Sequence, residues 1–393
     1  MSSPVELAAV EPVAASPVKA LPYRSWVEVS RPQIAANFRA IERVVGKGVE
    51  IMPVVKADAY RHGAIEVSRT LVEQGARWLA VSNTDEGVVL RDAGISARIL
   101  VMADFLPFTR EAMLAYQLTP VIHNLEDIAE LNKLAQSRAE KVPFHFKVDS
   151  GLSRLGVRWD AAGVAEAILA APNLELEGLM SHLASPANYG TKQTEEQIAV
   201  FDRLAGHLKA AGISPSLVHL SATIPIAYGR RQTWRGMVRP GHAIYGYVSP
   251  ARGHAPSRIL DVKPALTWRA TVLSVKELPA GACVGYGGMF KTTGPTRVAT
   301  LAAGYADGIP HKLSNRGSVI VHGRVAPILG AVSMDMTSVD VTQIPETRVG
   351  DAITLLGAEG NVQIDAQQIA KIAGTISYSV LCGIHARVKR VYV

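Results

Sequence analysis

The feature that most constrains this chain is the alternation of short apolar runs with longer helical patterns between residues 26 and 246. Each run is rich in aliphatic and β-branched side chains, which is typical of a strand buried on both faces of a sheet. The longer stretches carry apolar residues at helical spacing. The runs are residues 50–55, 78–82, 98–103, 118–123, 144–149, 174–182, 216–220 and 237–244, and the clearest helical stretches are 64–74, 125–136, 161–170 and 194–210.

Strands that alternate with helices predict a parallel sheet with helices on its faces. Eight such units within about 220 residues match the size of a (β/α)8 barrel. The rival architecture, an open doubly wound sheet, usually has a glycine-rich turn after its first strand. Here the first run is followed by Lys56-Ala57-Asp58. We therefore predict an α/β fold with a (β/α)8 TIM barrel over residues 25–256.

After Pro250 the sequence changes to strands separated by glycine and proline turns, with one helical pattern over residues 366–373. Short strands with turn signals predict a mostly β domain, which we assign to residues 257–393. The alternating run 26–30 is a candidate for one more strand of this domain. The other expected strands are 266–278, 297–302, 317–321, 337–341, 352–356 and 386–391.

The composition excludes several classes of protein. Of the 393 residues, 48% are apolar and 19% are charged, as in a globular chain and not a disordered or fibrous one. The net charge of +7 comes without a run of Lys and Arg, so it indicates a basic surface or an anionic ligand, with no nucleic-acid partner. Cys283 and Cys382 lack the spacing of a metal site or a disulfide framework. No apolar stretch is long enough to cross a membrane.

The N-terminus is rich in Ala, Val, Pro and Ser. A secretory signal needs a cationic start and an unbroken apolar stretch, and acidic residues and prolines interrupt both here. We expect residues 1–24 to be a flexible tail on a cytoplasmic protein. The alternative is that the tail is the remnant of an export segment.

Lys56 is the first candidate for catalysis, because catalytic groups of a barrel follow the carboxyl ends of its strands. It comes directly after the apolar run 51–55, and burial of its stem would lower the pKa of the amine and free it for Schiff-base chemistry. The alternative is a surface lysine that opens a loop. Tyr60, Arg61 and His62 follow within one turn and could bind a phosphate.

The fifth run supplies two further cations. Lys147 lies inside the expected strand, where a buried amine needs a partner or a neutralising modification. Arg154 lies just beyond the strand end, where its planar cation could bind a carboxylate. The alternative is a structural ion pair with Asp149.

The last three runs end in polar side chains. His182 ends the sixth run and His219 lies on the seventh; either could be a hydrogen-bonded core histidine, which we favour for His219. In the eighth run, Arg239 precedes Gly241, where the backbone can approach a ligand closely. The loops after strands seven and eight are the usual phosphate site of such barrels, so Arg239 could contact a phosphate or a cofactor ring.

The β domain carries three glycine-flanked or polar loops. Taken singly, the first is an ordinary hairpin, and Met334 is a packing residue. The loops are Gly285-Tyr286-Gly287-Gly288, Gly304-Tyr305-Ala306-Asp307-Gly308 and Ser333-Met334-Asp335-Met336.

Together these segments resemble alanine racemase, one of the fold-type III pyridoxal-phosphate enzymes. The resemblance covers nearly the whole chain from Trp26 to Val393, and seven short motifs in the same order make it specific. They are Val55-Lys56-Ala57-Asp58-Ala59-Tyr60, Lys147-Val148-Asp149 leading to Arg154-Leu155-Gly156, Arg239-Pro240-Gly241 with Tyr245-Gly246, the three loops of the β domain, and Tyr378-Ser379-Val380-Leu381-Cys382.

The resemblance implies a role for each motif. Lys56 is expected to hold pyridoxal phosphate as a Schiff base, with Tyr286 as the opposing base. Arg154 is expected near the substrate carboxylate and the phenolic oxygen of the cofactor. Lys147 is similar to a lysine that is carbamylated in many relatives.

The remaining motifs are implied to bind the cofactor or to complete the site. Arg239 is expected to face the pyridine nitrogen, with His182 bonded behind it. The resemblance further implies a homodimer, in which Tyr286 and three other residues reach the site from the second subunit. The expected phosphate ligands are Tyr60, Tyr378 and the backbone at Gly241 and His242, and the three residues that accompany Tyr286 are Met334, Asp335 and Tyr305.

Two departures from the family pattern stand out. The family usually has glycine after the tyrosine of the lysine motif, where this chain has Arg61. Its phosphate-binding stretch is typically His-x-Ala-Asn-Ser, where this chain has His219-Leu220-Ser221-Ala222-Thr223. Either Thr223 or Ser221 then supplies the hydroxyl to the phosphate. Both departures could mark a branch with altered substrate range.

The expected reaction is the interconversion of L- and D-alanine by two bases, Lys56 and Tyr286, with pyridoxal 5'-phosphate as the cofactor and no metal. The first alternative is a racemase that acts on several amino acids. A fold-type III decarboxylase and a non-catalytic protein that carries the cofactor are the others. The pair Tyr286 and Met334-Asp335, which belongs to the racemase pattern, argues against the decarboxylase. The presence of a whole β domain that carries Tyr286 argues against the carrier protein, because such proteins are short single barrels.

Overall fold

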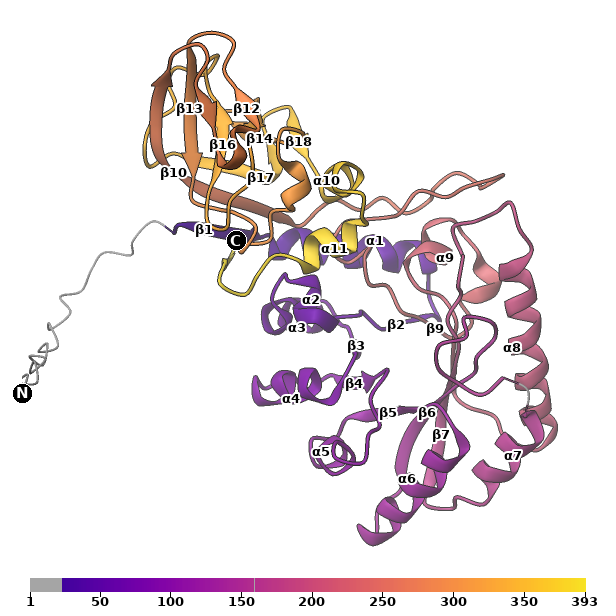
Figure 1. Cartoon of the computed structure of the whole chain (residues 1–393). Helices are drawn as coiled ribbons and strands as arrows, with labels where there is room; N and C mark the ends of the chain where they lie inside the picture. Colours follow the sequence, from indigo (N-terminus) through magenta and orange to yellow (C-terminus); the bar gives the residue numbers. More distant parts are fainter. Residues whose placement is uncertain (1–22, 159) are drawn as a thin grey trace, which may run out of the picture.

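The computed structural model describes residues 23–158 and 160–393. They form two bodies, a barrel of strands and helices and a β domain that stands on one end of it (Figure 1). Almost all of the expected tail, on which the export alternative depends, lies outside the described residues. Among the residues described, no helix combines the length and apolar character needed to span a bilayer.

The first body is a closed parallel barrel, as predicted. Six strands, β3 to β8, pair side by side in sequence order, and β2 pairs in parallel with β9. The two sheets join through a bridge between Val54 and Ala80 and through the amide of Arg239, which donates to the Ser221 carbonyl at 2.9 Å. The strands are β2 (Glu50–Ile51), β3 (Trp78–Val81), β4 (Arg98–Val101), β5 (Thr119–Ile122), β6 (Val142–Lys147), β7 (Leu174–Met180), β8 (Leu217–His219) and β9 (Met237–Val238).

Helices surround the barrel because most of them have one apolar face that must be buried, whereas the short α9 is buried throughout. In α6, for example, Ile128, Leu131 and Ala135 are buried at helical spacing, and Asn124 caps the first turn by accepting from the amide of Asp127. The outer helices are α1 (Arg31–Val45), α3 (Ala64–Glu73), α4 (Thr84–Asp92), α5 (Arg110–Ala115), α6 (Leu125–Ser137), α7 (Ala161–Leu169), α8 (Gln193–Ala210) and α9 (Thr223–Ala227).

The second body is a nine-stranded sheet, which confirms the mostly β C-terminal domain. The long strand β10 (Leu266–Leu278) pairs with β13 (Thr296–Leu301) and also with β17 (Ala352–Glu359), so six of its strands close into a small antiparallel barrel. The other members of this barrel are β14 (Ser318–Val321), β15 (Arg324–Leu329) and β16 (Thr337–Asp340), with β18 (Val362–Ile364) attached to β17.

Both ends of the described chain join the second sheet. Strand β1 (Ser25–Val29) pairs antiparallel with β10 and parallel with the last strand, β19 (Lys389–Tyr392). The final residue is fixed as well: the amide of Val393 donates to Val29, and its carbonyl accepts from the amide of Arg31. The expected strand at residues 26–30 therefore belongs to the β domain.

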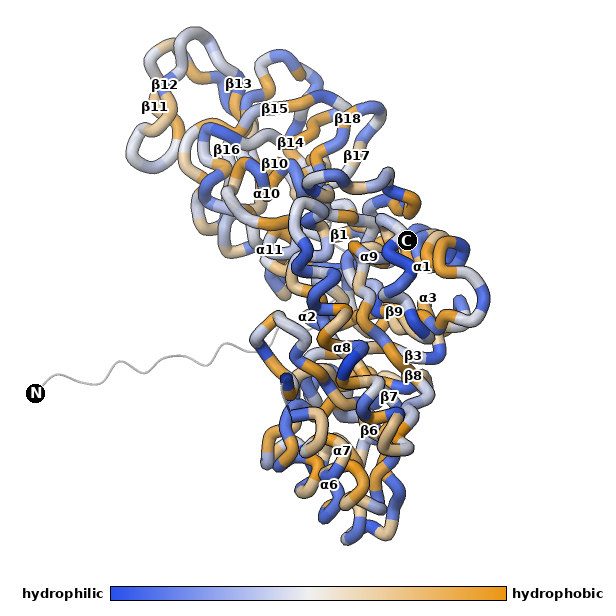
Figure 2. The backbone as a smooth tube through the Cα atoms, turned by 90° about the vertical axis from the view of Figure 1, so that its right-hand side faces the viewer, coloured by the Kyte–Doolittle hydropathy of each residue, from blue (hydrophilic) through white to orange (hydrophobic). Residues whose placement is uncertain are grey.

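The C-terminal segments connect the β domain to the mouth of the barrel. Helices α10 (Ala366–Ala373) and α11 (Ser377–Cys382) lie between the two bodies (Figures 1 and 2), and α11 contacts the turn that begins at Lys56. Arg390 of β19 donates to the carbonyl of Arg61, and Arg61 donates to the carbonyl of Cys382. The segment that follows Lys56 is thus held by the last residues of the chain.

A substitution at Gly63 tests the packing of this segment against Tyr392 of β19. The φ of Gly63 is +91°, and a Cβ there would lie 1.7 Å from the hydroxyl of Tyr392. Gly63→Ala should lower the free energy of unfolding by about 1–3 kcal/mol, the usual cost of a strained backbone conformation. Chemical denaturation measures the change.

The matched control is Gly206→Ala in α8, where nothing lies within 4 Å of the added methyl group. Because alanine favours a helix, this variant should be as stable as the parent or more stable by up to about 1 kcal/mol. Equal stability of the two variants would contradict the packing described for Gly63.

Candidate active site

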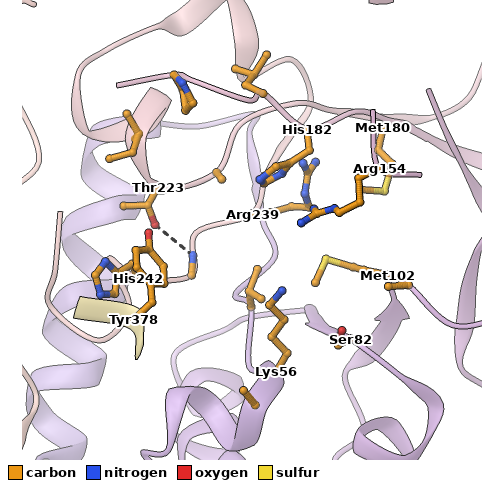
Figure 3. A pocket seen from close by; sticks show the side chains of 18 of the residues that line it. Lys56, Ser82, Met102, Arg154, Met180, His182, Thr223, Arg239, His242 and Tyr378 are labelled. Atoms are coloured by element: carbon orange, nitrogen blue, oxygen red, sulfur yellow. Dashed lines mark hydrogen bonds between the residues drawn. The ribbon is translucent and has the colours of Figure 1, made fainter. Parts of the chain in front are cut away.

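A cavity of about 660 Å³ opens at the carboxyl end of the barrel strands, beneath α11. Lys56 rises into it from one side, between a group that contains Tyr378 and His242 and a group that contains Arg154 and Arg239 (Figure 3). The cavity brings together ten of the residues singled out from the sequence: Lys56, Tyr60, Lys147, Arg154, His182, Thr223, Arg239, Gly241, His242 and Tyr378.

The cavity wall is cationic. Lys56, Lys147, Arg154 and Arg239 line it, and among the described residues no aspartate or glutamate does. Cations in a partly buried space without counter-charges attract anionic ligands strongly. The residues therefore fit a ligand with more than one negative group, such as a phosphate ester together with a carboxylate.

Lys56 opens a left-handed turn, α2 (Lys56–Tyr60). Ala57, Asp58 and Ala59 have φ between 52° and 54°, which costs about 1–2 kcal/mol for each residue that has a Cβ. The Glu86 carboxylate offsets part of this cost by accepting from the amides of Ala57 and Ser82, at 2.6 and 2.8 Å. The turn directs the lysine away from the strand and into the cavity.

The left-handed turn continues through Arg61, whose φ is 66°. This geometry explains why glycine suits that position, since glycine adopts positive φ without a steric penalty. Arg61 is absent from the cavity wall, and its side chain donates to Cys382. The departure at Arg61 therefore leaves the cavity itself unchanged.

One end of the cavity is suited to a phosphate. Gly241 lines this end, and a larger residue would not fit there, because a Cβ would lie 2.5 Å from the hydroxyl of Tyr60. Burial raises the pKa of Tyr60 and of Tyr378, so both keep a hydroxyl proton to donate. Burial also lowers the pKa of His242 to about 3, so its ring is neutral.

The two candidate hydroxyls for the phosphate differ in position. Thr223 lines the cavity, and its Oγ1 accepts from the amides of Gly241 and Ala243. Ser221 is fully buried and lies 2.5 Å from the hydroxyl of Thr233, outside the cavity wall. The geometry favours Thr223.

Arg239 is fixed deep in the barrel by neighbours from β8 and the end of β7. Its guanidinium donates to His219 Nδ1, to the His219 carbonyl and to the Ser181 carbonyl, each at 2.7 Å. The expectation that His182 lies bonded behind Arg239 is therefore wrong. His219 takes that place because β8 neighbours β9, and His182 faces the cavity, where burial and Arg239 lower its pKa to about 3.

Lys147 is 5% exposed and lies among other cations. Burial lowers the pKa of its amine to about 8, with further contributions from Arg154 and Arg239. The alternative of an ion pair between Arg154 and Asp149 has no support, because Asp149 Oδ1 accepts from three successive backbone amides of its own loop. Arg154 points into the cavity instead (Figure 3).

Four predicted site residues lie elsewhere, on the β domain. Tyr286, Met334 and Tyr305 are 77%, 54% and 45% exposed, and none of them lines the cavity. The loops of Tyr305 and Met334 are linked by backbone hydrogen bonds, and Asp335 accepts from Arg387 at 2.7 Å. Within one chain, these residues and the cavity remain apart.

Several cavity residues were not expected from the sequence. Ser82 and Met102 follow β3 and β4, so the rule that active sites lie beyond the strand ends could have found them. Cys382 ends the motif that carries Tyr378, and its position one turn further along α11 could have placed it on the same wall. No group of three or more His, Cys, Asp or Glu in the described part of the chain could hold a metal ion.

Both domains of the chain match the same protein family. Residues 29–250 match the model of the alanine racemase N-terminal domain, and residues 265–392 match that of its C-terminal domain. Alanine racemase of Halothermothrix orenii is 40% identical over 94% of this chain and 96% of its own length. That of Carboxydothermus hydrogenoformans is 37% identical over 94% and 99%.

The fold is also similar to that of solved alanine racemases. The enzyme from Streptomyces lavendulae superposes with a TM-score of 0.89 at 30% identity, over 95% of this chain and 98% of that one. An alanine racemase from Bartonella henselae, solved with covalently bound pyridoxal phosphate, gives 0.84 at 28% identity, over 95% and 100%.

Glu86 offers a test of the left-handed turn. Glu86→Ala should lower the free energy of unfolding by about 1–3 kcal/mol, since two amides lose a charged acceptor. Amide hydrogen exchange at Ala57 and Ser82 should accelerate. Asp92→Ala, an exposed change at the other end of α4, should leave both quantities near those of the parent; a similar loss in both variants would contradict the role given to Glu86.

Proposed function

The chain belongs to the alanine racemase family of pyridoxal-phosphate-dependent isomerases, and we propose that Lys56 and Tyr286 are the two groups with which it interconverts L- and D-alanine. The observation that carries the proposal is the cavity itself: a lysine at a strand end among cations, with no carboxylate among the described residues of the wall. A solved relative, the alanine racemase of Bartonella henselae, carries covalently bound pyridoxal phosphate, which supports this cofactor.

The residues of the cavity fit this cofactor. Neutral hydroxyls, among them that of Thr223, and the accessible backbone at Gly241 suit the phosphate. Arg239 suits the pyridine nitrogen, and Lys56 suits covalent attachment. When bound, pyridoxal phosphate supplies an electron sink that allows a proton to leave the substrate Cα.

The chain's own residues would move that proton. The Lys56 amine would serve one face of the substrate Cα, and the Tyr286 hydroxyl the opposite face, so that a proton removed on one side is returned on the other. A tyrosine needs a nearby cation to act as a base near neutral pH. Arg154, which also suits the substrate carboxylate, is the candidate for that cation.

Tyr286 can serve the cavity only from a second copy of the chain, so we propose a homodimer with shared sites. Tyr286, Met334 and Tyr305 are large side chains left exposed on one domain, as is usual for an interface. Asp335, held by Arg387, would approach with them. Such a dimer would place a tyrosine opposite Lys56 in each cavity.

Lys147 fits the carbamate seen in many members of the family. Its lowered pKa leaves part of the amine neutral near pH 7 to 8, the form that reacts with carbon dioxide. The amine would bond to the carbon of CO2 and release one proton to solvent. The resulting anion would lie beside Arg154 and compensate part of the cationic wall.

A racemase of broader range is the second candidate. Ala222 lies on the cavity wall at the position where the family typically has asparagine, so this departure, unlike that at Arg61, changes the lining of the cavity. A panel of L-amino acids, assayed for their D-enantiomers, distinguishes the two: turnover of alanine alone supports the narrow function.

Lys56→Ala tests the attachment site. The variant should retain no pyridoxal phosphate after dialysis and should not racemise alanine, because the only amine proposed for attachment is gone. Visible absorbance and chiral analysis of the product measure the two effects. Lys133→Ala, an exposed change on α6, is the control and should match the parent; cofactor that stays covalently bound in Lys56→Ala would exclude the assignment.

Tyr286→Phe tests the second base. The variant should keep bound cofactor, while turnover should fall by roughly 10²–10⁴-fold, as for other positioned acid–base groups. Solvent deuterium should still enter D-alanine, which Lys56 is proposed to serve, and enter L-alanine far more slowly. Tyr116→Phe, on the barrel, is the control. Equal exchange into both enantiomers would move the role to Tyr305.

The same variants test the shared site. Lys56→Ala and Tyr286→Phe dimers are each expected to be inactive, but a mixed dimer would have one cavity with both bases. Activity should therefore return when subunits exchange. Mixed dimers, verified by mass, that remain inactive would rule out a tyrosine contributed by the second subunit.

A further inference from the structure

The end of the cavity that suits a phosphate is completed from outside the barrel. Among the described residues that line the cavity, only Tyr378 and Cys382 come from the β domain, and both belong to α11. This helix has 6 residues, and so short a helix is not stable by its own hydrogen bonds. The place of the Tyr378 hydroxyl therefore depends on side-chain contacts between α11 and the barrel.

His242 supplies the contact with the Tyr378 ring. The two ring centroids lie 3.8 Å apart and the planes are inclined by 25°, so the rings are stacked. His242 Nε2 also lies 3.4 Å from the hydroxyl oxygen of Ser377, the preceding residue of α11. Figure 3 shows Tyr378 beside His242, with its hydroxyl directed toward Thr223. One barrel side chain thus contacts two successive residues of α11.

The ring of His242 is itself fixed by the barrel. It is 1% exposed, and the ring of Tyr247 lies nearly parallel to it, with the centroids 5.1 Å apart and the planes inclined by 19°. On either side of His242, the amides of Gly241 and Ala243 donate to Thr223 Oγ1. His242 therefore presents a fixed face to a helix that arrives from the other domain.

His242 acts here as an uncharged ring. Burial lowers its pKa to about 3, so the imidazole is neutral, and its Nδ1 has no hydrogen-bond partner among the described residues. A stacked pair of rings contributes roughly 2–12-fold to an equilibrium beyond the burial of its area. The second tyrosine at this end, Tyr60, packs on Tyr245 with the centroids 4.6 Å apart, so its position is set within the barrel.

We propose that the side chain of His242 is a positioning group: Tyr378 stacks on its ring, and this contact holds a hydroxyl of the β domain at the phosphate of the cofactor. The inference rests on the proposed function, in which Tyr378 binds that phosphate. Because the Tyr378 hydroxyl would meet only the phosphate, loss of the stack should weaken ligands that carry a phosphate and spare those without one. General damage to the fold would weaken both.

Three replacements separate the parts of this contact. His242→Phe keeps a flat ring without nitrogens, His242→Leu keeps a side chain of similar size without a ring, and Tyr378→Phe keeps the stack without the hydroxyl. The double variant His242→Leu/Tyr378→Phe completes a cycle with the two single variants. His207→Leu, an exposed change on α8, is the matched control.

The first readout is the dissociation constant of the full-length apoenzyme for pyridoxal 5'-phosphate and for pyridoxal, which lacks the phosphate, measured by absorbance titration. His242→Leu should weaken binding of the phosphate ester by roughly 2–12-fold and leave pyridoxal unchanged. His242→Phe and His207→Leu should match the parent. In the Tyr378→Phe background, His242→Leu should have no further effect, because no hydroxyl remains to be positioned.

Several results would overturn the proposal. Equal weakening of both ligands by His242→Leu would indicate general damage to the site, and an unchanged affinity for the phosphate ester would show that the stack has no effect. Additive losses in the double variant would show that His242 acts without Tyr378. A loss in His242→Phe as large as that in His242→Leu would show that a ring nitrogen is required and that stacking is not the cause.

The second readout needs no replacement at His242. Amide hydrogen exchange of residues 377–382 should slow when the parent apoenzyme binds pyridoxal 5'-phosphate and stay unchanged with pyridoxal, because only the phosphate gives Tyr378 a further partner. Equal protection by the two ligands would contradict the proposal. Failure of the proposed function would appear differently: the parent would not racemise alanine, whereas these binding measurements need no turnover.

Discussion

Like charges repel when they are placed together in a partly buried space, and four of them meet above this barrel: Lys56, Lys147, Arg154 and Arg239. Much of the site follows from this repulsion. The wall attracts ligands with several negative groups, burial together with the neighbouring cations lowers the pKa of Lys147 to about 8, and the phosphate end is built from neutral hydroxyls and backbone amides. The deepest cation, Arg239, is held by backbone carbonyls and by the ring of His219.

The position of Lys56 depends on contacts from three parts of the sequence. Its left-handed turn is unfavourable by itself, and Glu86 of α4 and Asp58 of the turn satisfy amides on either side of it. The β domain adds Arg390, which binds the carbonyl of Arg61. A locally strained segment persists because the surrounding structure fixes it, as is common at active sites.

The sequence predicted the barrel well because buried parallel strands are apolar throughout, and each of the eight expected runs overlaps a strand. It missed β15, whose exposed Arg324 and Val325 dilute the apolar pattern. From the sequence we expected His182 behind Arg239, where the structure has His219. The reason is that strand order alone does not reveal which side chains point into the core. Likewise Thr223 lies beyond the end of β8, where strand alternation gives no guide to direction.

Strand β1, which precedes the barrel in the sequence, pairs only with β10 and β19, and Val393 is bonded to Val29 and Arg31. This closure has a consequence for synthesis on the ribosome. The barrel strands leave the ribosome long before β19, yet the turn that carries Lys56 lacks its bond to Arg390, and β1 lacks one neighbour, until β19 has emerged. A nascent chain therefore cannot complete the lysine turn while only the barrel strands have emerged, because the turn needs a bond from a strand residue that is synthesised 329 residues later.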